Sequence, residues 1–222
     1  GGDMEPEWRD RAEAEVIGCS DAICVSCPEE ERQFRRLYGD PAGRIEIVPP
    51  AVEHAFFAPG DRRGARRAVG LPEGGDVVLF VGRIQPLKGL DVAVPPVRRW
   101  VEQGGQFVLL GTGERSLEHE YALLEQRHPG RASVRLRFDP KYARRIYAGA
   151  DALLIPSRYE PCGLTQMIAM RYGSVPVARR TGGLADTIVD AGDPGGTGIL
   201  YDEESSVWLW DAMERMLRVY SQ

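Results

Sequence analysis

Short apolar runs alternate with helical segments along most of this chain. The runs of strand length are residues 76–81, 107–110, 134–136, 152–155 and 175–178, and a turn follows each of them. Alternation of this kind predicts parallel strands joined by right-handed crossovers that carry helices. We therefore expect the α/β class, with a doubly wound, Rossmann-like parallel sheet.

The first fifty residues continue the same rhythm. We predict a helix over 5–17, a strand over 21–25, a helix that starts at Pro28, and a strand over 45–48. No linker between two full domains is visible, so we expect a single domain over 1–222. The opening residues 1–4 are expected to be a vector-derived remnant on a fragment of a longer protein.

Later helices are predicted at 117–127, 141–147, 164–172 and 205–220, and 191–198 is predicted to be a surface loop. A helix from Lys88 is expected to be interrupted, or to begin late, because Pro95 and Pro96 lie within it.

Composition excludes some functions. The net charge is -5, from 28 basic and 33 acidic residues, which gives no support for a nucleic-acid partner. No apolar stretch approaches the roughly 20 residues that span a bilayer, so we expect no membrane span and a cytoplasmic location. Paired arginines at 62–63, 66–67, 144–145 and 179–180 are interpreted as solvated helix faces, with phosphate binding as the alternative.

The cysteines give no sign of a metal site. Cys24 and Cys27 form a single C-x-x-C pair without the second pair or the nearby histidines that zinc would need. We interpret these two residues, with Cys19 and Cys162, as small buried residues in a reducing compartment. We expect no metal and no cofactor.

Glu160 is the most informative single residue. It lies in the turn between the apolar run 152–155 and a helical segment that begins near Leu164. The carboxyl ends of parallel strands meet at one edge of a sheet, where open α/β folds bind ligands. Backbone N–H groups at a helix start attract phosphate, and a glutamate accepts hydrogen bonds from hydroxyl groups. Phosphate together with a polyol predicts a sugar nucleotide as the ligand.

Other strand ends should surround the same crevice. Arg83 and Lys88 lie in one turn beside Gly82, where two cations can bind a diphosphate. Taken without the other strand ends, the pair would be better explained as two exposed charges of a polar turn. Gly111 and Gly113 are weak evidence, because a tight turn alone explains them.

Phe138 follows a strand and either stacks on a nucleobase or packs in the core. Thr181, Gly182 and Gly183 provide small residues and open N–H groups at a helix start, which suits a phosphate or a sugar hydroxyl but also an ordinary cap.

Two motifs carry a family resemblance. Residues 160–166 read Glu-Pro-Cys-Gly-Leu-Thr-Gln, and residues 180–186 read Arg-Thr-Gly-Gly-Leu-Ala-Asp. With 106–113 and 144–151, they resemble the C-terminal, donor-binding domain of bacterial glycogen synthases, which are retaining glycosyltransferases of the GT-B architecture that use ADP-glucose. Residues 47–53, 57–61 and 79–89 are more similar to the family of the inositol-phosphate N-acetylglucosaminyltransferase and sucrose-phosphate synthase. The mixture suggests a divergent enzyme or a chimera joined between about 88 and 104.

The resemblance implies roles for individual residues. Arg83 and Lys88 would hold the diphosphate of an ADP- or UDP-sugar, and Glu160 would contact the transferred sugar. Backbone N–H groups of Cys162, Gly163 and Leu164, with Thr165 beside them, would bind hydroxyl groups and phosphate, and Phe138 would meet the base. No general base is visible among the three histidines. The N-terminal acceptor domain of such an enzyme is missing, so we expect weak donor binding and little or no transfer.

Two departures from the family patterns are visible. Ile168 stands where the second family has a glutamate that commonly binds ribose, and Ala51 stands where it has a glycine. A positive φ at Ala51 would strain the chain. Two alternatives to a donor domain stay open at this point: a non-catalytic or engineered nucleotide-binding domain, and a sugar-nucleotide epimerase, which the 160–164 run argues against.

Overall fold

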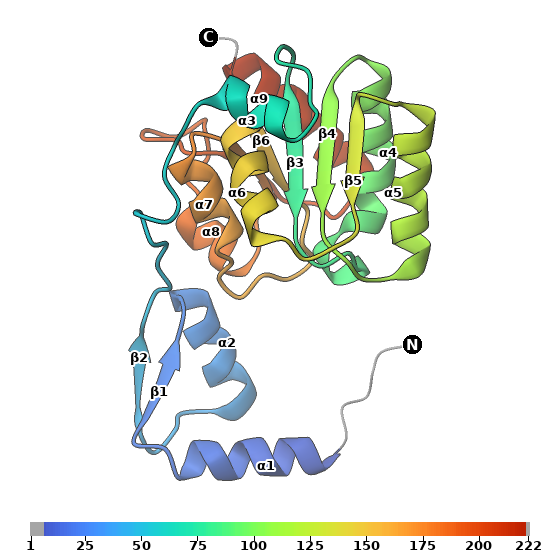
Figure 1. Ribbon diagram of the computed structural model, residues 1–222. Coiled ribbons are helices and arrows are strands. Elements are labelled where there is room, and N and C mark those ends of the chain that lie inside the picture. The colour runs from blue at the N-terminus through green and yellow to red at the C-terminus, as the bar shows by residue number, and fades with distance from the viewer. Residues whose placement is uncertain (1–6, 221–222) are drawn as a thin grey trace. The chain divides into compact units, whose positions relative to one another are not determined.

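The computed structural model describes residues 7–220, and the remnant expected at 1–4 lies outside them. Its contacts divide the chain into two compact units, Gly1–Pro50 and Ala51–Gln222. The single domain expected over 1–222 stays a prediction, because a grouping of contacts does not show which parts of the chain fold independently. Figure 1 labels the elements of each unit.

The first unit contains two helices and two short strands, which are α1 (Glu7–Gly18), β1 (Ala22–Val25), α2 (Pro28–Tyr38) and β2 (Arg44–Ile47). β1 and β2 pair in parallel as a two-stranded sheet. Pro28 occupies the first turn of α2, where its missing N–H costs nothing, and three glutamates there face the positive end of the helix dipole.

The cysteine expectation is only partly correct. Cys27 is buried and caps α2, because its Sγ accepts a hydrogen bond from the N–H of Glu30 at 3.4 Å. Cys162 is also buried, but Cys19 and Cys24 are exposed. The expectation was wrong for Cys24 because β1 pairs, among the described residues, with β2 alone, and it was wrong for Cys19 because that residue lies in the exposed connection between α1 and β1.

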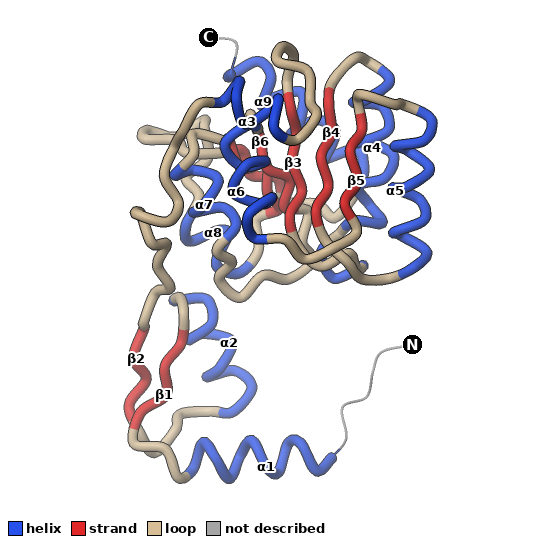
Figure 2. Tube along the Cα trace, viewed as in Figure 1, coloured by secondary structure: helices blue, strands red, loops and turns tan. Residues whose placement is uncertain are grey.

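The second unit is built on a six-stranded parallel sheet, which confirms the predicted fold class (Figure 2). Its strands are β3 (Val77–Val81), β4 (Gln106–Leu110), β5 (Ala132–Arg135), β6 (Ala152–Ile155), β7 (Val175–Arg179) and β8 (Ile199–Tyr201). They are ordered β5-β4-β3-β6-β7-β8. The sequence analysis did not predict β8.

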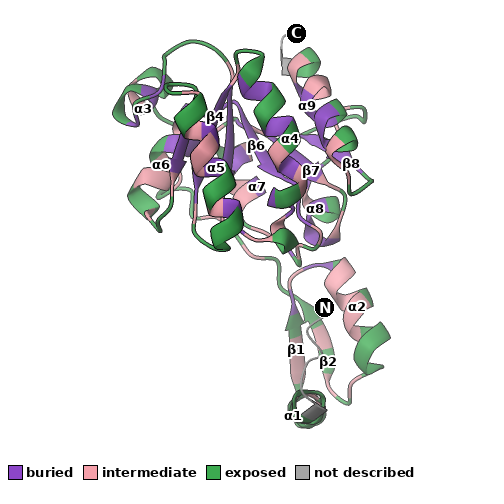
Figure 3. Ribbon diagram, turned by 90° about the vertical axis from the view of Figure 1, so that its right-hand side faces the viewer, coloured by how far each residue is buried: buried purple, intermediate pink, exposed green. Residues whose placement is uncertain are grey.

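Helices cover both faces of this sheet. One face packs on α4 (Leu90–Glu102), α5 (Arg115–Arg127) and α9 (Ser206–Tyr220), and the other on α3 (Arg62–Ala68), α6 (Pro140–Gly149), α7 (Thr165–Arg171) and α8 (Gly182–Thr187). Because side chains alternate along a strand, Val78 and Phe80 join the first core, and Val77 and Leu79 the second. The strands are therefore buried on both sides, as Figure 3 shows in purple.

Helix α4 contradicts the expected proline break, because it runs from Leu90 through Pro95 and Pro96 to Glu102. Pro96 has no N–H to donate to the carbonyl of Val92, four residues earlier. The hydroxyl of Ser206, at the start of α9, donates to that carbonyl at 2.7 Å instead. A partner distant in the sequence thus satisfies the group that one of the prolines leaves free.

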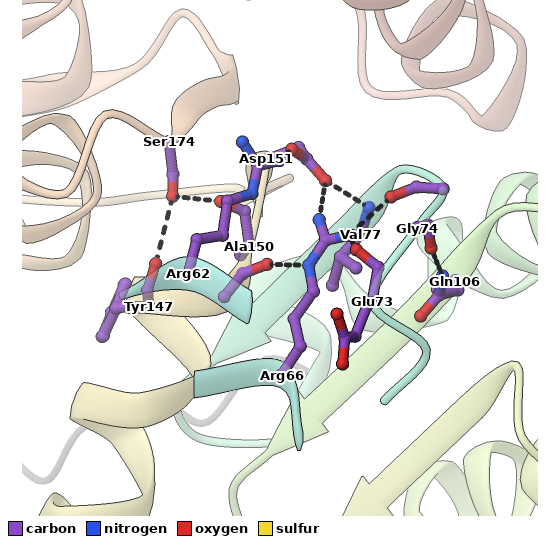
Figure 4. Close-up of polar contacts among 12 residues, drawn as sticks. Arg62, Arg66, Glu73, Gly74, Val77, Gln106, Tyr147, Ala150, Asp151 and Ser174 are labelled. Atoms are coloured by element: carbon purple, nitrogen blue, oxygen red, sulfur yellow. Dashed lines mark hydrogen bonds and ion pairs between the residues drawn. The ribbon is translucent and has the colours of Figure 1, made fainter. Parts of the chain in front are cut away.

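The arginine pair 66–67 is not simply a solvated helix face, because the side chain of Arg66 is buried. Figure 4 shows its polar contacts. Its guanidinium donates to the carbonyls of Gly149, Glu73 and Gly75 at 2.8–2.9 Å, and to the carboxylate of Asp151 at 2.6 Å. The same Asp151 carboxylate accepts the N–H of Val77 at 2.7 Å. This ion pair fastens α3 to the starts of β3 and β6.

The chain order reverses between β3 and β6. From β3 the chain moves outward to β4 and β5, then returns to place β6 on the other side of β3. The loops that leave the carboxyl ends of β3 and β6 therefore diverge and leave a crevice, which is the position where doubly wound sheets bind ligands.

Candidate functional site

A pocket of about 800 Å³ opens at the carboxyl edge of the large sheet. This volume lies in the range of small-molecule sites. The residues predicted for the site that line it are Gly82, Arg83, Lys88, Gly111, Phe138 and Thr165. The loops after β3, β4, β5 and β6 thus reach one pocket, as the parallel sheet predicts.

Lys88 is held by a tight turn. Pro86–Lys88 form a single turn of 3-10 helix that ends at Gly89, whose φ is 69°. A side chain on Gly89 would place its Cβ 1.9 Å from the carbonyl oxygen of Pro156, at the end of β6. Only glycine permits this left-handed turn so close to the neighbouring loop, and the turn delivers Lys88 to the pocket.

Glu160 meets Lys88 across the crevice. The Nζ of Lys88 donates to Oε2 of Glu160 at 2.6 Å, and the Ser157 hydroxyl lies 3.3 Å from the same oxygen. The side chains of Lys88 and Glu160 are 25% and 13% exposed. Lys88 lines the pocket, whereas Glu160 does not line it and reaches it only through its contact with Lys88. Lys88, in the loop after β3, and Glu160, in the loop after β6, therefore lie together at the carboxyl edge of the sheet.

Arg83 is exposed and lines the same pocket. Within the described part of the chain, no hydrogen bond or ion pair holds its side chain. Its guanidinium is therefore available to an anion, and a guanidinium can bind two oxygens of a phosphate at once.

Phe138 is 91% exposed, which excludes the core-packing interpretation. The next residue, Asp139, caps α6 by accepting the N–H of Tyr142 at 2.9 Å. That backbone hydrogen bond, with Arg137 beside the carboxylate, lowers the pKa of Asp139. The capped helix start therefore fixes the backbone that presents the Phe138 ring at the pocket.

Gly111 and Gly113 help to join the turns after β3 and β4. The N–H of Gly82 donates to the carbonyl of Leu110 at 3.0 Å, and the N–H of Ile84 to that of Thr112 at 2.9 Å. The N–H of Gly113 is taken by the carboxylate of Glu118 at 2.7 Å. Gly111 lines the pocket, whereas Gly113 serves the turn.

The loop 160–165 rests on the start of α8. Gly182 has a φ of 47°, and a Cβ there would lie 2.0 Å from the carbonyl oxygen of Glu160. The N–H of Gly183 donates to the carbonyls of Glu160 and Pro161 at 2.9 and 3.0 Å. The open N–H expected at Gly183 is therefore occupied, because it supports the loop that carries Glu160. Thr181 lies beside it, and its hydroxyl contacts the carbonyl of Arg158 at 3.4 Å.

Cys162 is buried, and Leu164 is exposed. Neither these two residues nor Gly163 lines the pocket, although Thr165 does. The backbone N–H groups of Gly163 and Leu164 have no partner in the part of the chain that the structure describes. These groups lie between Glu160 and the pocket-lining Thr165 in the sequence, so they are available near the site.

The sequence analysis missed several residues of the pocket. Phe56, Phe57, Tyr147 and Ile168 contribute to its wall. The guanidinium of Arg144 lies 4.4 Å from the centre of the Phe56 ring, which places the 51–60 segment against α6. The sequence carried no signal for this contact, because Phe56 lies in a loop 88 positions before Arg144.

Ile168 and Ala51, the two positions that depart from the family patterns, differ in how they affect the structure. Ile168 lines the pocket and offers only an apolar surface there. Among the described residues, no residue other than glycine has a positive φ, so Ala51 does not strain its turn. No group of three or more His, Cys, Asp or Glu side chains suited to a metal ion occurs within residues 7–220.

Comparison with known proteins identifies the family. Residues 61–220 match the family described as "Glycosyl transferases group 1". The chain belongs to this family. A glycogen synthase of Pseudomonas paraeruginosa is 48% identical over 212 residues, covering 91% of this chain and 40% of that protein. One of Thermodesulfovibrio yellowstonii is 43% identical over 145 residues, covering 65% of this chain and 28% of that protein.

Solved structures agree with the predicted GT-B resemblance. The catalytic domain of starch synthase IV from Arabidopsis thaliana, bound to ADP and acarbose, has a TM-score of 0.83 at 26% identity, covering 95% of this chain and 50% of that one. Sucrose-phosphate synthase from Thermosynechococcus elongatus has a TM-score of 0.84 at 27% identity, covering 98% and 54%. This glycosyltransferase group 1 chain thus resembles both families recognised in its sequence.

The chain spans less than half the length of the glycogen synthases it matches, 28% and 40% in the two examples above. The 212-residue alignment crosses residues 88–104, where a family junction was suggested, and the junction stays a prediction. No helix among the described residues has the length and apolar character to cross a membrane.

Proposed function

We propose that this chain is the donor-binding half of a glycogen-synthase-like, retaining glycosyltransferase that binds an ADP- or UDP-sugar. The observation that carries the proposal is the 2.6 Å contact between Glu160 and Lys88, because Lys88 lines the pocket at the switch point together with Arg83 and Phe138. Two cations, an acid and an exposed ring match the diphosphate, sugar and base of one ligand.

The cations would act on the leaving group. When the bond between the anomeric carbon and the diphosphate breaks, negative charge develops on the phosphate oxygens. Arg83 and Lys88 are placed to stabilise that charge, which lowers the barrier to bond breaking. The ammonium of Lys88 has three N–H donors, so it can keep Glu160 and still donate to a phosphate.

Glu160 would act on the sugar. Its carboxylate would accept hydrogen bonds from sugar hydroxyls and oppose the positive charge that develops on the ring as the bond breaks. The N–H groups of Gly163 and Leu164 would donate to the same ligand. The apolar surface of Ile168 suggests that ribose is recognised elsewhere, from groups such as the backbone of the turns after β3 and β4.

The first unit supports the proposal that an acceptor half is missing. Parallel strands normally have both faces buried, yet in β1 and β2 only Val25 is buried. Ile47 and Val48 are 41% and 56% exposed. We infer that these strands belong to a larger sheet formed with the part of the protein that this chain does not cover, and that transfer requires that part.

Calorimetry tests donor binding. ADP, UDP and their glucose derivatives should each be titrated into the chain, and binding by at least one nucleotide is expected at up to millimolar concentration. Arg83→Ala and Lys88→Ala should both weaken it, whereas Arg180→Ala should not. The absence of heat and of a thermal shift at millimolar ligand for every nucleotide would count against the donor site.

An assay of sugar transfer tests the proposal that an acceptor half is needed for activity. The chain should be fused behind the remaining N-terminal part of a glycogen synthase and assayed for sugar transfer. Transfer that disappears in Glu160→Gln would support the enzymatic proposal. Retained nucleotide affinity without transfer would instead favour a non-catalytic nucleotide-binding domain, which is the second candidate because the chain carries only part of a cleft.

A further inference from the structure

Arg158 lies two positions before Glu160 and links the two loops of the site. Its guanidinium forms a bidentate pair with the carboxylate of Asp91, at 2.7 and 2.8 Å, and its Nε contacts Glu204 at 2.7 Å. It also donates to the carbonyl of Pro86, in the turn that carries Lys88. One side chain thus binds the Lys88 turn, the start of α4 and the segment before α9.

The backbone of Arg158 strengthens the same link. Its N–H donates to the carbonyl of Leu87 at 2.9 Å, and its carbonyl accepts from the guanidinium of Arg179. Leu87 and Lys88 are neighbours, so this hydrogen bond joins the Glu160 loop to the Lys88 turn directly. The two loops leave the paired strands β3 and β6 and diverge at the switch point, so no covalent bond fixes the distance between them.

The ion pairs of Arg158 with Asp91 and Glu204 are too exposed to contribute much to the stability of the fold. The side chains of Arg158, Asp91 and Glu204 are 28%, 38% and 41% exposed. Ion pairs this open to water add little to global stability. A planar guanidinium with two partners on one carboxylate does, however, fix orientation well, which lysine cannot imitate.

We propose that Arg158 is a positioning residue that sets the spacing between the Lys88 turn and the Glu160 loop, so that a nucleotide sugar meets both at once. The consequence for ligand binding rests on the function proposed above, whereas the link between the loops does not. The role differs from that of Arg83 and Lys88, because Arg158 acts through other groups and does not line the pocket.

The first experiment needs no ligand. Backbone amide hydrogen exchange should be measured in the whole chain and in Arg158→Ala. The amides of Arg158 and Gly89, which bond to Leu87 and Pro86, should exchange about tenfold faster in the variant, while those of β6 are unchanged. Arg158→Lys should behave like Arg158→Ala. Unchanged exchange at both amides would overturn the proposal, whether or not any nucleotide binds.

The second experiment measures affinity with ADP as the probe. Arg158→Ala should raise the Kd about tenfold, with little change in the urea midpoint. In a Lys88→Ala background, the same substitution should cost about twofold at most, because its effect passes through Lys88. The control is Arg180→Ala. Arg180 follows β7 and forms an exposed ion pair with Asp202, which follows β8, so its removal should leave Kd unchanged.

The outcomes separate the two proposals. If ADP and UDP both fail to bind the unmodified chain, the donor-site function falls and the exchange result still decides the role of Arg158. If ADP binds and Arg158→Ala binds it equally well, or loses the same factor in both backgrounds, Arg158 does not position the site.

Discussion

At the scale of single residues, Phe138 has the greatest exposure among the large apolar side chains described, 91%. If it stacks on a base, Phe138→Ala should weaken nucleotide binding about tenfold, since base–aromatic stacking contributes about 1–3 kcal/mol. Stability should hardly change, because the ring has almost no packing to lose. Calorimetry and thermal unfolding of the same samples measure both effects.

Phe138→Tyr provides the matched control, because it keeps the ring and should keep the affinity. A Kd for Phe138→Ala equal to that of the unmodified chain would show that the base is bound elsewhere in the pocket.

Asp151 gives a prediction about stability instead of binding. It is buried and pairs with the buried Arg66 (1% and 3% side-chain exposure) and with the exposed Arg62. Asp151→Asn leaves a buried guanidinium without its counter-charge, and breaking a buried pair in this way costs about 3–5 kcal/mol. Urea unfolding should show a loss of that size in the free energy of unfolding of the second unit.

The control for that loss is Asp202→Asn, which removes the exposed partner of Arg180 and should change stability by less than about 0.5 kcal/mol. Similar effects of Asp151→Asn and Asp202→Asn would mean that the buried pair contributes nothing specific.

The roles of some of these residues could be predicted from the sequence, and the roles of others could not. Glu160 and Lys88 follow apolar runs, so strand ends alone placed them at one edge. Arg66 carries no such signal, because its partner Asp151 lies 85 positions later and an arginine-rich helix usually faces water. Arg158 was equally hidden, since its role depends on Asp91 and Glu204, which come from two other elements.

At the scale of elements, β8 and α9 are joined by Asp190. Burial alone would raise the pKa of Asp190, but Arg215 of α9 and the N–H groups of Leu200 and Gly192 outweigh it and lower the pKa to about 2. A lowered folded-state pKa stabilises the protein above the unfolded-state value and loses that effect as pH falls toward 2. We expect about 1–2 kcal/mol of stability to disappear between about pH 4 and pH 2.

Asp190→Asn tests this prediction through the pH dependence of urea unfolding. The variant should be less stable than the unmodified chain at pH 7, and the difference should shrink as pH falls below 4. The control is Asp193→Asn, an exposed acid of the same loop, whose difference should stay near zero throughout. A difference for Asp190→Asn that is constant with pH would contradict the prediction.

β8 and α4 are two elements for which prediction from the local sequence is wrong. Ile199–Tyr201 is only three residues long after a loop rich in glycine, so no periodicity marks it as a strand. It becomes one because it pairs with β7 and because Asp190 accepts the N–H of Leu200. In α4 the local rule predicts a break at the prolines that does not occur, since the hydroxyl of Ser206 in α9 donates to a carbonyl that a proline leaves free. In both cases the secondary structure depends on a partner that is distant in the sequence.

At the scale of the whole molecule, the parallel sheet was predictable because each of its longer strands is an apolar run. The division at Pro50 was not, because the first unit repeats the same order of helix and strand. What distinguishes that unit is how little it buries, and burial depends on neighbours that the sequence does not show. Val25 and Cys27 are its only buried apolar residues within the described part.

This difference in burial predicts a difference in protection. A unit of about 50 residues buries a small share of its surface and is only marginally stable by itself, whereas the second unit has a sheet buried on both faces. Amides of β1 and β2 should therefore exchange with solvent far faster than those of β3, β4 and β6, and a urea titration followed by exchange should unfold the first unit at lower concentration. Fusion behind the N-terminal part of a glycogen synthase should raise protection in β1 and β2 and leave β3 unchanged. Equal protection of β1 and β3 in the chain as it stands would refute the view that the first unit needs further strands, because its own residues would then suffice to hold it folded.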